Sequence, residues 1–462
     1  MDFDASHWQG RLDTLSAAHR VPGAVLAVLA DDTVHELATG ILHRGTGVEA
    51  TTDAVFQLGS VAKVYTATLA MTLAEEGLLD LDAPVRDVLP GFALPDERAA
   101  QVITPRHLLS HTSGLSCDLV VDTGRGDDCL ARFVEACAEE ELDCPPGSTH
   151  SYSTSGFSVL GRAIEVLTGR TWDQALRDRV LTPLGLEHTM TLPEEALRFR
   201  TAMGHVEGAG PDPEPAPAWD LMTRSSSPGA MVMATAADVV GLARAHLAGG
   251  TAADGTRVLT PRTVEAMREK QADTPDKWSA DSDGWGLGWT LYDWDGVPGF
   301  GHDGAATGQY SYLRVVPGAG VAIALVTNGG GARALYADLF RELLAALADV
   351  RMPDRFAPPE QPPTVDPAPF TGTYRRPGVV VTVTASGRGL HMVYEFVDGM
   401  SHFSPPLVAD LVPVAVTATE TVYAASSGGS PFGGEWMPVV FATLADGTPC
   451  AYVGMRATPK VA

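Results

Sequence analysis

Positive charge is scarce in this chain of 462 residues. Lys and Arg together number 32 against 57 Asp and Glu, which gives a formal net charge of -25 at pH 7. A protein of that sign repels nucleic-acid phosphates and anionic lipid surfaces. The charge balance therefore argues against nucleic acid and membranes as partners.

Targeting and membrane segments are also missing. The chain starts with Met1-Asp2-Phe3-Asp4, whereas a secretory signal starts with basic residues and continues into an apolar core. No stretch reaches the ~18 consecutive apolar residues that a membrane span needs. We therefore expect a cytoplasmic protein with no membrane contact, unless a leader has been removed.

Metal, redox and nucleotide motifs are absent as well. The five cysteines (Cys117, Cys129, Cys137, Cys144 and Cys450) are odd in number and contain no C-x-x-C pair. We interpret them as reduced and mostly structural, Cys117 included. Because the chain also lacks H-E-x-x-H and a Walker-type G-x-x-x-x-G-K, we expect no metal and no cofactor, and without a G-x-S-x-G elbow it does not resemble an α/β-hydrolase.

Two proline-rich stretches, 208–218 and 353–369, interrupt the chain. Proline fixes φ and lacks an N–H, so neither stretch belongs inside a helix or a central strand. Helical Ala/Leu-rich segments and short Val-rich strands precede the second stretch, and Thr, Val and Tyr alternate with glycine turns after it. We therefore expect an α/β domain at 1–352, a linker at 353–369 and an all-β domain at 370–462.

Several elements are predictable individually. Ser60–Glu76 is apolar almost all round and is followed by Gly77, which predicts a buried helix with a glycine C-cap. Thr104–Leu109 and Ser155–Thr168 also predict helices, and the apolar, β-branched run Val321–Thr327 predicts a central strand. In the tail we expect an antiparallel sheet or barrel with strands at Val379–Thr384, Leu390–Phe396, Val412–Tyr423 and Met437–Leu444.

The chemistry begins with Ser60-Val61-Ala62-Lys63, at the start of the buried helix. A separation of three residues is nearly one helical turn, so the hydroxyl and the amine lie on the same face. A serine hydroxyl is a weak nucleophile until a base takes its proton. A buried amine near the positive end of a helix dipole disfavours its charged form and can be that base. The pattern predicts Ser60 as nucleophile and Lys63 as its base.

A simpler alternative makes Ser60 a helix N-cap and Lys63 a solvated side chain, because S-x-x-K occurs in many proteins. Against it, this is the only S-x-x-K in the chain, and Lys63 is one of four lysines among 32 basic residues. Arginine does not lose its proton at any useful pH, so a site that needs a neutral amine must keep lysine.

Two further groups complete the predicted site. Tyr152 stands just before the helix expected at Ser155, where its hydroxyl would relay a proton to the leaving group, although a lone tyrosine more often serves packing. His302 lies in the glycine-flanked run Gly301–Ala305, a strand edge along which a substrate can bind, although by itself it fits an ordinary polar strand end. The amide of Ala305 would join that of Ser60 as an oxyanion hole.

Taken in order, these motifs resemble the class C β-lactamase and D-peptidase superfamily over roughly residues 10–350. In that family the S-x-x-K serine is acylated, the tyrosine of a Y-x-N motif assists proton transfer, and a K-T-G or H-x-G strand lines the substrate. The resemblance implies these roles for Ser60 with Lys63, for Tyr152, and for His302 with Gly304. The residues that carry it are Phe56 to Lys63, Leu108-Leu109-Ser110-His111-Thr112-Ser113-Gly114-Leu115, Tyr152-Ser153-Thr154, Gly286-Leu287-Gly288-Trp289 and His302-Asp303-Gly304.

Within the superfamily, the chain is most similar to penicillin-binding-protein-type thioesterases of peptide biosynthesis. These enzymes carry a lipocalin-like C-terminal domain and release nonribosomal peptides by head-to-tail cyclisation. The resemblance implies a β-lactamase-like domain with a central antiparallel sheet flanked by helices, followed by a small lipocalin-like β domain that opens near Phe370–Tyr374. It also implies that Arg456, near the last strand, meets a substrate carboxylate or carbonyl. Thr154 departs from the family's usual asparagine and puts recognition of a substrate amide at that position in doubt.

We therefore expect a serine acyl-transfer enzyme that macrocyclises a peptidyl thioester or ester with a D-configured C-terminal residue, presented by a peptidyl carrier protein. The main alternative is a hydrolase of the esterase, D-aminopeptidase or D,D-peptidase type, which uses water as the acceptor. A further alternative, a penicillin-binding sensor or an inactive scaffold, is disfavoured because no membrane span is evident and both Ser60 and Lys63 are retained.

Overall fold

In the computed structural model of the chain, the described residues are 3–117, 121–208, 210–387, 389–397, 401, 405–426 and 436–462. The larger body is built on a nine-stranded antiparallel sheet with the order β3-β2-β1-β14-β13-β12-β11-β10-β9. Its strands are β1 (Gly23–Ala30), β2 (Thr33–His43), β3 (Val48–Glu49), β9 (Ala272–Asp273), β10 (Gly284–Trp285), β11 (Thr290–Trp294), β12 (Val297–Ala306), β13 (Gln309–Val316) and β14 (Val321–Thr327).

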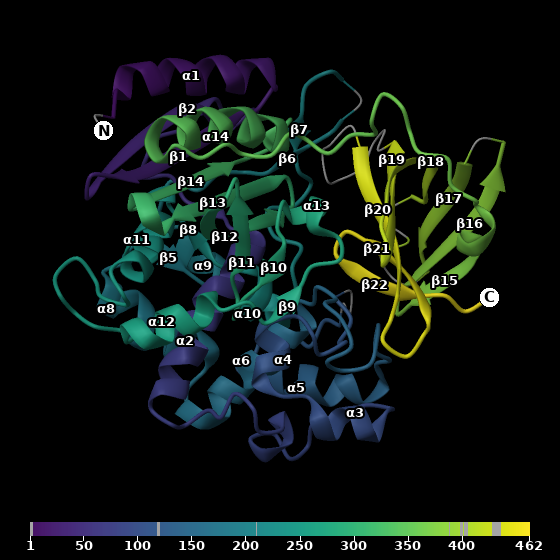
Figure 1. Cartoon of the computed structure of the whole chain (residues 1–462). Coiled ribbons are helices and arrows are strands. Elements are labelled where there is room, and N and C mark those ends of the chain that lie inside the picture. The colour runs from purple at the N-terminus through teal and green to yellow at the C-terminus, as the bar shows by residue number, and fades with distance from the viewer. Residues whose placement is uncertain are drawn as a thin grey trace.

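Helices cover both faces of this sheet (Figure 1). Every residue of β1 is buried, and successive side chains enter opposite layers: Ala24, Leu26 and Val28 pack in one cluster, Val25 and Ala27 in the other. The run Val321–Thr327 is confirmed as β14, the neighbour of β1. This two-sided burial explains why both central strands are continuous apolar runs.

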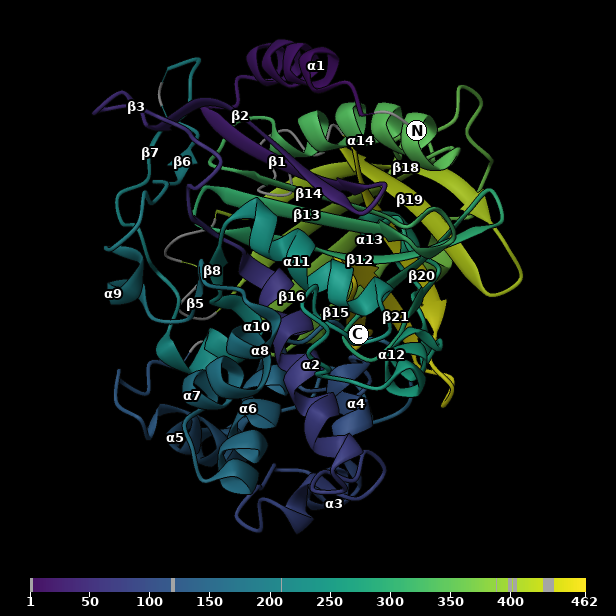
Figure 2. The same ribbon diagram turned by 90° about the vertical axis from the view of Figure 1, so that its left-hand side faces the viewer.

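Figures 1 and 2 place helix α1 (Ala5–Ala18) and α14 (Ala332–Ala348) on one face of the sheet, with α2 (Ala62–Glu75) and α11 (Ala236–Leu247) on the other. The remaining helices are α3 (Glu97–Val102), α4 (Pro105–Leu109), α5 (Cys129–Ala136), α6 (Ser155–Thr168), α7 (Trp172–Leu176), α8 (Thr182–Leu184), α9 (Pro193–Ala196), α10 (Ser227–Ala230), α12 (Pro261–Arg268) and α13 (Lys277–Ala280). A small three-stranded sheet has the order β4 (Phe56–Gln57), β8 (Met233–Ala234) and β5 (Thr189–Met190), and a two-stranded sheet is formed by β6 (His205–Val206) and β7 (Glu214–Pro215).

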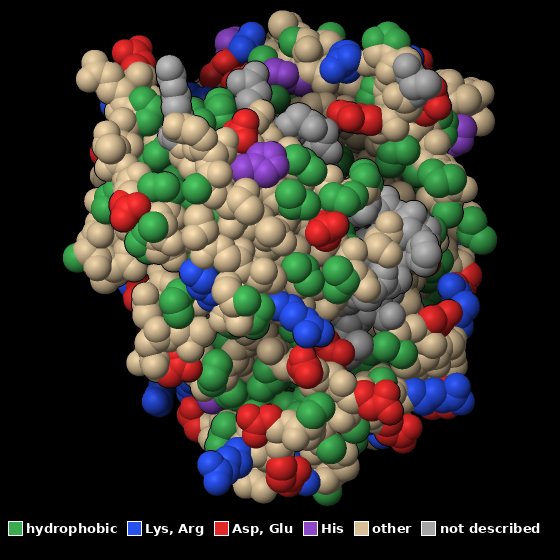
Figure 3. Space-filling model, turned by 90° about the vertical axis from the view of Figure 1, so that its right-hand side faces the viewer, with side chains coloured by type: hydrophobic (Ala, Val, Ile, Leu, Met, Phe, Trp, Pro, Cys, Tyr) green, Lys and Arg blue, Asp and Glu red, His purple; other side chains and the backbone are tan. Residues whose placement is uncertain are grey.

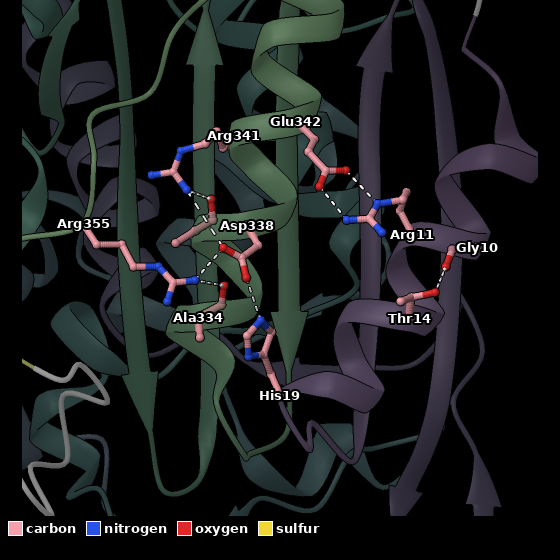
Figure 4. Close-up of polar contacts among 10 residues, drawn as sticks. Gly10, Arg11, Thr14, His19, Ala334, Asp338, Arg341, Glu342 and Arg355 are labelled. Carbon is pink, nitrogen blue, oxygen red and sulfur yellow. Dashed lines mark hydrogen bonds and ion pairs between the residues drawn. The ribbon is translucent and has the colours of Figure 1, made fainter.

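Polar contacts fasten α1 to α14 at the rim of that layer (Figure 4). Arg11 donates two hydrogen bonds to the carboxylate of Glu342, at 2.6 and 2.8 Å, and the imidazole of His19 lies 2.8 Å from Asp338. The Arg11 and Glu342 side chains are about one-third exposed, so such a pair contributes roughly 0–1 kcal/mol. Apolar packing between the helices therefore dominates their docking.

The smaller body is an eight-stranded antiparallel sheet in sequence order, rolled into a nearly closed barrel. A bridge between Tyr374 and Lys460, with the Val461 N–H donating to the Thr373 carbonyl at 2.8 Å, joins the first strand to the last. Its strands are β15 (Gly372–Arg376), β16 (Val379–Ser386), β17 (Gly389–Phe396), β18 (Leu407–Val416), β19 (Glu420–Ser426), β20 (Trp436–Thr443), β21 (Pro449–Val453) and β22 (Arg456–Pro459).

One strand prediction in the tail was wrong. Residues 412–423 belong to two strands, β18 and β19, rather than one. The hydroxyl of Thr417 accepts hydrogen bonds from the N–H groups of Thr419 and Glu420, at 3.3 and 3.1 Å, and folds the chain back. A threonine side chain that bonds its own backbone competes with the strand ladder, which the apolar alternation did not reveal.

The barrel packs against the larger body through a shared apolar cluster. Cys144 and Trp278 from the larger body contact the group that contains Val440 and Tyr452 from the barrel. No helix or strand is formed over 349–367, which lead from α14 to the barrel and contribute Phe356 to the same cluster.

On the barrel side of the surface, acidic and basic side chains lie beside one another (Figure 3). Among the described residues, no helix combines the length and the apolarity required to cross a membrane.

Candidate active site

Ser60 lies on a 3-10 turn, Gly59–Val61, that leads directly into α2. The sequence predicted a helix from Ser60 onward, and the structure begins the regular α-helix two residues later, at Ala62. Gly59 has φ +52°, and a Cβ at this position would lie 2.4 Å from the Ala305 carbonyl oxygen. The turn therefore depends on glycine, and it seats Ser60 against strand β12.

Lys63 is completely buried beneath Ser60. Its Nζ lies 3.3 Å from Ser60 Oγ, 3.2 Å from Thr154 Oγ1 and 2.6 Å from the carbonyl oxygen of Gly229. A neutral amine has two N–H donors and one lone pair. If the donors serve Gly229 and Thr154, the lone pair is left to accept the proton of the Ser60 hydroxyl.

Burial is also what lowers the pKa of Lys63 to about 7, and the neighbouring Arg456 acts in the same direction. The Coulombic interaction with Cys117 raises this pKa, but the effect of burial is larger and the pKa is lowered overall. A large fraction of Lys63 is consequently neutral near pH 7, as a general base requires.

Tyr152 completes the polar triangle around Ser60. Burial raises the pKa of its phenol, while a hydrogen bond with Ser60 acts in the opposite direction. Lys63 Nζ lies 4.7 Å from the centre of the Tyr152 ring. The phenol is therefore protonated at neutral pH and is placed to donate or pass on a proton next to the nucleophile.

The backbone around Tyr152 is held from two sides. The N–H groups of Ser151 and Ser153 donate to His111, to its carbonyl oxygen at 2.8 Å and to its Nδ1 at 3.0 Å. The N–H of Tyr152 points the other way and donates to the carbonyl oxygen of Met455 in the barrel, at 2.9 Å. Burial holds the pKa of His111 well below its ordinary value, which keeps Nδ1 an acceptor.

His302 lies on β12 and faces Tyr152 and Trp285, with ring centres 6.2 and 5.5 Å away. Burial lowers its pKa to about 3, so the ring is neutral at pH 7. Nδ1 lies 2.6 Å from the Asp303 carbonyl oxygen and must carry the proton, which leaves Nε2 as an acceptor with no partner among the described residues. This nitrogen is also shielded from solvent.

Gly304 and Ala305 bring β12 into close contact with the nucleophile. A Cβ on Gly304 would lie 1.9 Å from the Leu58 carbonyl oxygen and 2.9 Å from Ser60 N. A Cβ on Gly59 would lie 2.5 Å from Ala305 N. The amides of Ser60 and Ala305 thus stand close together beside the nucleophile, as an oxyanion hole requires.

Arg456, the residue after Met455, also connects the barrel to the active site. Arg456 donates through Nη2 to Cys117 Sγ at 3.2 Å, and its guanidinium lies 5.6 Å from the centre of the Tyr152 ring. Cys117 Sγ in turn lies 3.6 Å from Thr154 Oγ1. All the residues singled out from the sequence therefore gather in one place, Arg456 and Thr154 included.

Sequence reasoning missed several members of the site. Cys117 was set aside as structural, yet it is half-buried and contacts Thr154 and Arg456. The Gly229 carbonyl carried no sequence signal, because any residue presents one. His111 did have a signal, since it lies in the Leu108–Leu115 run that supports the family resemblance. All five cysteines are free, and the described residues contain no group of three or more His, Cys, Asp or Glu arranged to hold a metal ion.

The chain is similar to a known protein family and to individual known proteins. A family model described as Beta-lactamase matches residues 8–348. Penicillin-binding protein 4 from Amycolatopsis lactamdurans is 61% identical over 378 residues, covering 82% of this chain and 99% of that protein. Unguisins hydrolase ungD' from Aspergillus campestris is 26% identical over 409 residues, covering 79% and 74% of the two chains.

Among solved structures, the crystal structure of SurE aligns with a TM-score of 0.77 and 28% identity, covering 99% of each chain. A second crystal structure of SurE, with D-Leu, aligns equally well. This similarity includes the C-terminal barrel as well as the larger body.

Proposed function

Since the chain belongs to the beta-lactamase family, whose members are serine hydrolases or acyltransferases, we propose that it carries an acyl group on Ser60 and transfers it to an amine of the same substrate. The observation that carries the acyl-transfer step is the contact of Ser60 Oγ with both a buried lysine of lowered pKa and a protonated tyrosine. In this arrangement a general base, Lys63, and a general acid, Tyr152, both contact the nucleophile Ser60.

In the first half-reaction, Ser60 Oγ attacks the carbonyl carbon of a thioester or ester, and Lys63 Nζ accepts the hydroxyl proton. The amides of Ser60 and Ala305 stabilise the oxyanion. The bond from carbon to sulfur or oxygen then breaks, Tyr152 supplies a proton to the leaving group, and Lys63 reprotonates Tyr152. The product is an ester of Ser60.

In the second half-reaction, the amino terminus of the bound acyl chain attacks the ester carbonyl. Neutral Lys63 accepts the proton that the amine loses, either directly or through the Tyr152 hydroxyl, which passes on its own proton, and Lys63 then returns a proton to Ser60 Oγ as the C–O bond breaks. The released product is a macrolactam. Strand β12, which carries His302 and Gly304 and packs against the turn of Ser60, is proposed to line the bound acyl chain.

Two observations support an internal amine rather than water as the acceptor. The barrel places Arg456 next to Tyr152, and we propose that the barrel limits the access of water at this position. In addition, the likeness to SurE spans 99% of both chains, and the second SurE structure contains D-Leu, a D-configured amino acid. The proposed substrate is a linear peptidyl thioester or ester with a D-residue at its C-terminus, presented by a carrier protein.

A second candidate function is hydrolysis of the same acyl-enzyme. It is favoured by the 61% identity to a protein named Penicillin-binding protein 4, and by the similarity to a protein named as a hydrolase. In that case the substrate is a D-residue peptide, amide or ester, and water resolves the ester of Ser60. The two functions share Ser60, Lys63 and Tyr152 and differ only in the acceptor.

The experiment that separates them follows adducts and products together. The enzyme is mixed with a synthetic peptidyl thioester that ends in D-Leu, the protein is measured by intact-mass spectrometry, and the released peptide is analysed by chromatography. A Ser60-dependent adduct with a cyclic product supports the cyclase. An adduct that resolves only to the linear acid establishes the hydrolase. Absence of any adduct with this thioester, a D-residue ester and benzylpenicillin overturns both.

A further inference from the structure

The hairpin turn between β21 and β22 has an unusual residue at its tip. Gly454 and Met455 occupy the two central positions, and both have positive φ, +60° and +67°. Turns of this kind favour glycine or asparagine, because a side chain in the left-handed region costs roughly 1–2 kcal/mol. Methionine therefore needs contacts that hold the turn in place.

Those contacts come from the larger body and involve both backbone groups of Met455. Its N–H donates to a carboxylate oxygen of Asp276 at 2.8 Å, and its carbonyl oxygen accepts from the N–H of Tyr152 at 2.9 Å. One residue of the barrel therefore bridges a buried carboxylate and the segment of the active-site tyrosine. The next residue, Arg456, extends into the same site.

Asp276 is held in a position to accept the hydrogen bond from the Met455 N–H. It precedes α13, is completely buried, and also accepts hydrogen bonds from Ser279, from its N–H at 3.3 Å and from its hydroxyl at 2.6 Å. Burial raises the pKa of Asp276 to about 6, and the hydrogen bonds from Ser279 and Met455 oppose the rise. A carboxylate accepts at both oxygens, so no neutral side chain of the same size reproduces this set of bonds.

We propose that Asp276 is a positioning residue of the active site, which acts through the Met455 peptide to fix both Tyr152 and Arg456. This inference rests on acyl transfer at Ser60 and not on the nature of the acceptor. Of the three consecutive N–H groups at 151–153, His111 holds the outer two, and the barrel holds the one that belongs to Tyr152. Loss of the Asp276 contact frees the turn and with it the backbone anchor of the tyrosine.

A matched control exists in the same interface. The Tyr452 hydroxyl and Thr149 Oγ1 lie within hydrogen-bond distance, 2.8 Å apart, across the two bodies and away from the 454–455 turn. Tyr452→Phe deletes this bond without touching Met455. It weakens the interface by one hydrogen bond, as Asp276→Ala does, but leaves the bridge to Tyr152 in place.

The test compares Asp276→Ala, Asp276→Asn and Tyr452→Phe in the full-length chain. The first readout is hydrogen–deuterium exchange in the peptide that contains Tyr152. The second is the rate of Ser60 acylation by a p-nitrophenyl ester of a D-residue, with kcat and KM separated, and thermal unfolding reports folding. We expect Asp276→Ala to accelerate exchange at this peptide and to lower kcat by up to about 100-fold, as a displacement of about 1 Å does. Asp276→Asn, which keeps one acceptor, should recover part of both, and Tyr452→Phe should change neither.

Faster exchange without a change in kcat, or equal effects of Asp276→Ala and Tyr452→Phe, would reduce Asp276 to a structural role and overturn the inference. If Asp276→Ala does not fold, Asp276→Asn decides on the same two readouts. If the wild-type chain is acylated by neither this ester, the peptidyl thioester nor benzylpenicillin, the proposed function fails, whereas exchange at Tyr152 still decides whether Asp276 controls that backbone.

Discussion

Lys63 Nζ lies 2.6 Å from the carbonyl oxygen of Gly229, the shortest of its three polar contacts. A carbonyl oxygen only accepts, so this contact fixes one N–H of the amine and with it the direction of the remaining positions on nitrogen. The remaining two positions face Thr154 and Ser60, and when Thr154 takes the second N–H the lone pair of the neutral amine is directed at Ser60. The orientation of the base is set by backbone, and its protonation is set by burial.

The pH dependence of acylation follows from this arrangement. Lys63 must be neutral to accept the Ser60 proton, and its pKa is lowered to about 7. The acylation rate should therefore rise with pH, reach half its maximum near pH 7 and level off above it. One pH unit below the pKa, about one-tenth of the sites are active. Stopped-flow acylation with a p-nitrophenyl ester on both sides of pH 7 measures the profile, and a flat profile would contradict the assignment of Lys63.

Replacement of the two central residues should separate their roles. Ser60→Ala removes the nucleophile, so the acyl adduct should disappear from the intact-mass spectrum while the thermal unfolding curve stays near that of the wild type. Lys63→Arg keeps the positive charge but provides no base, and should slow acylation by about 10²–10⁴-fold. An active Lys63→Arg enzyme would assign the base to another group.

Thr154 offers a test of the departure from the usual family asparagine. Its hydroxyl is a hydrogen-bond partner of Lys63 Nζ at 3.2 Å. Thr154→Val keeps the shape and removes this bond, and should lower kcat by about 10- to 150-fold, since a hydrogen bond to a chargeable group contributes roughly 1.5–3 kcal/mol. Steady-state kinetics with the p-nitrophenyl ester checks the prediction. A change confined to KM would instead make Thr154 a residue of substrate binding.

Much of the site was predictable because its central residues lie close together in the sequence, in short motifs. Ser60 and Lys63 share a helical turn, and the lysine stands out in a chain that otherwise prefers arginine. A continuous apolar run located the central strand β14, and alternation located three of the eight described strands of the tail, β16, β17 and β20.

Contacts that depend on tertiary placement were not predictable. The acceptor for Lys63 is the carbonyl of Gly229, 166 residues away, and a carbonyl leaves no trace in residue identity. The bridge from Asp276 to Met455 is also invisible, because a lone aspartate before a four-residue helix resembles an ordinary cap.

Gly304 provides the most direct test of the close approach between β12 and the nucleophile. A methyl group at this position would lie 1.9 Å from the Leu58 carbonyl oxygen, 2.6 Å from Ser311 Oγ and 2.9 Å from Ser60 N. Two of these atoms belong to backbone, so relief requires movement of β12 away from the turn that carries Ser60. Because this contact sets the separation of β12, which carries the Ala305 amide, from the turn that carries the Ser60 amide, Gly304→Ala should open the oxyanion hole and lower kcat by about 10²–10³-fold. Gly318→Ala is the matched control, since a Cβ there meets no atom within 4 Å and should leave kcat unchanged. Acylation kinetics and thermal unfolding of both variants check the argument, and a fully active Gly304→Ala enzyme would show that the hole is formed by other donors.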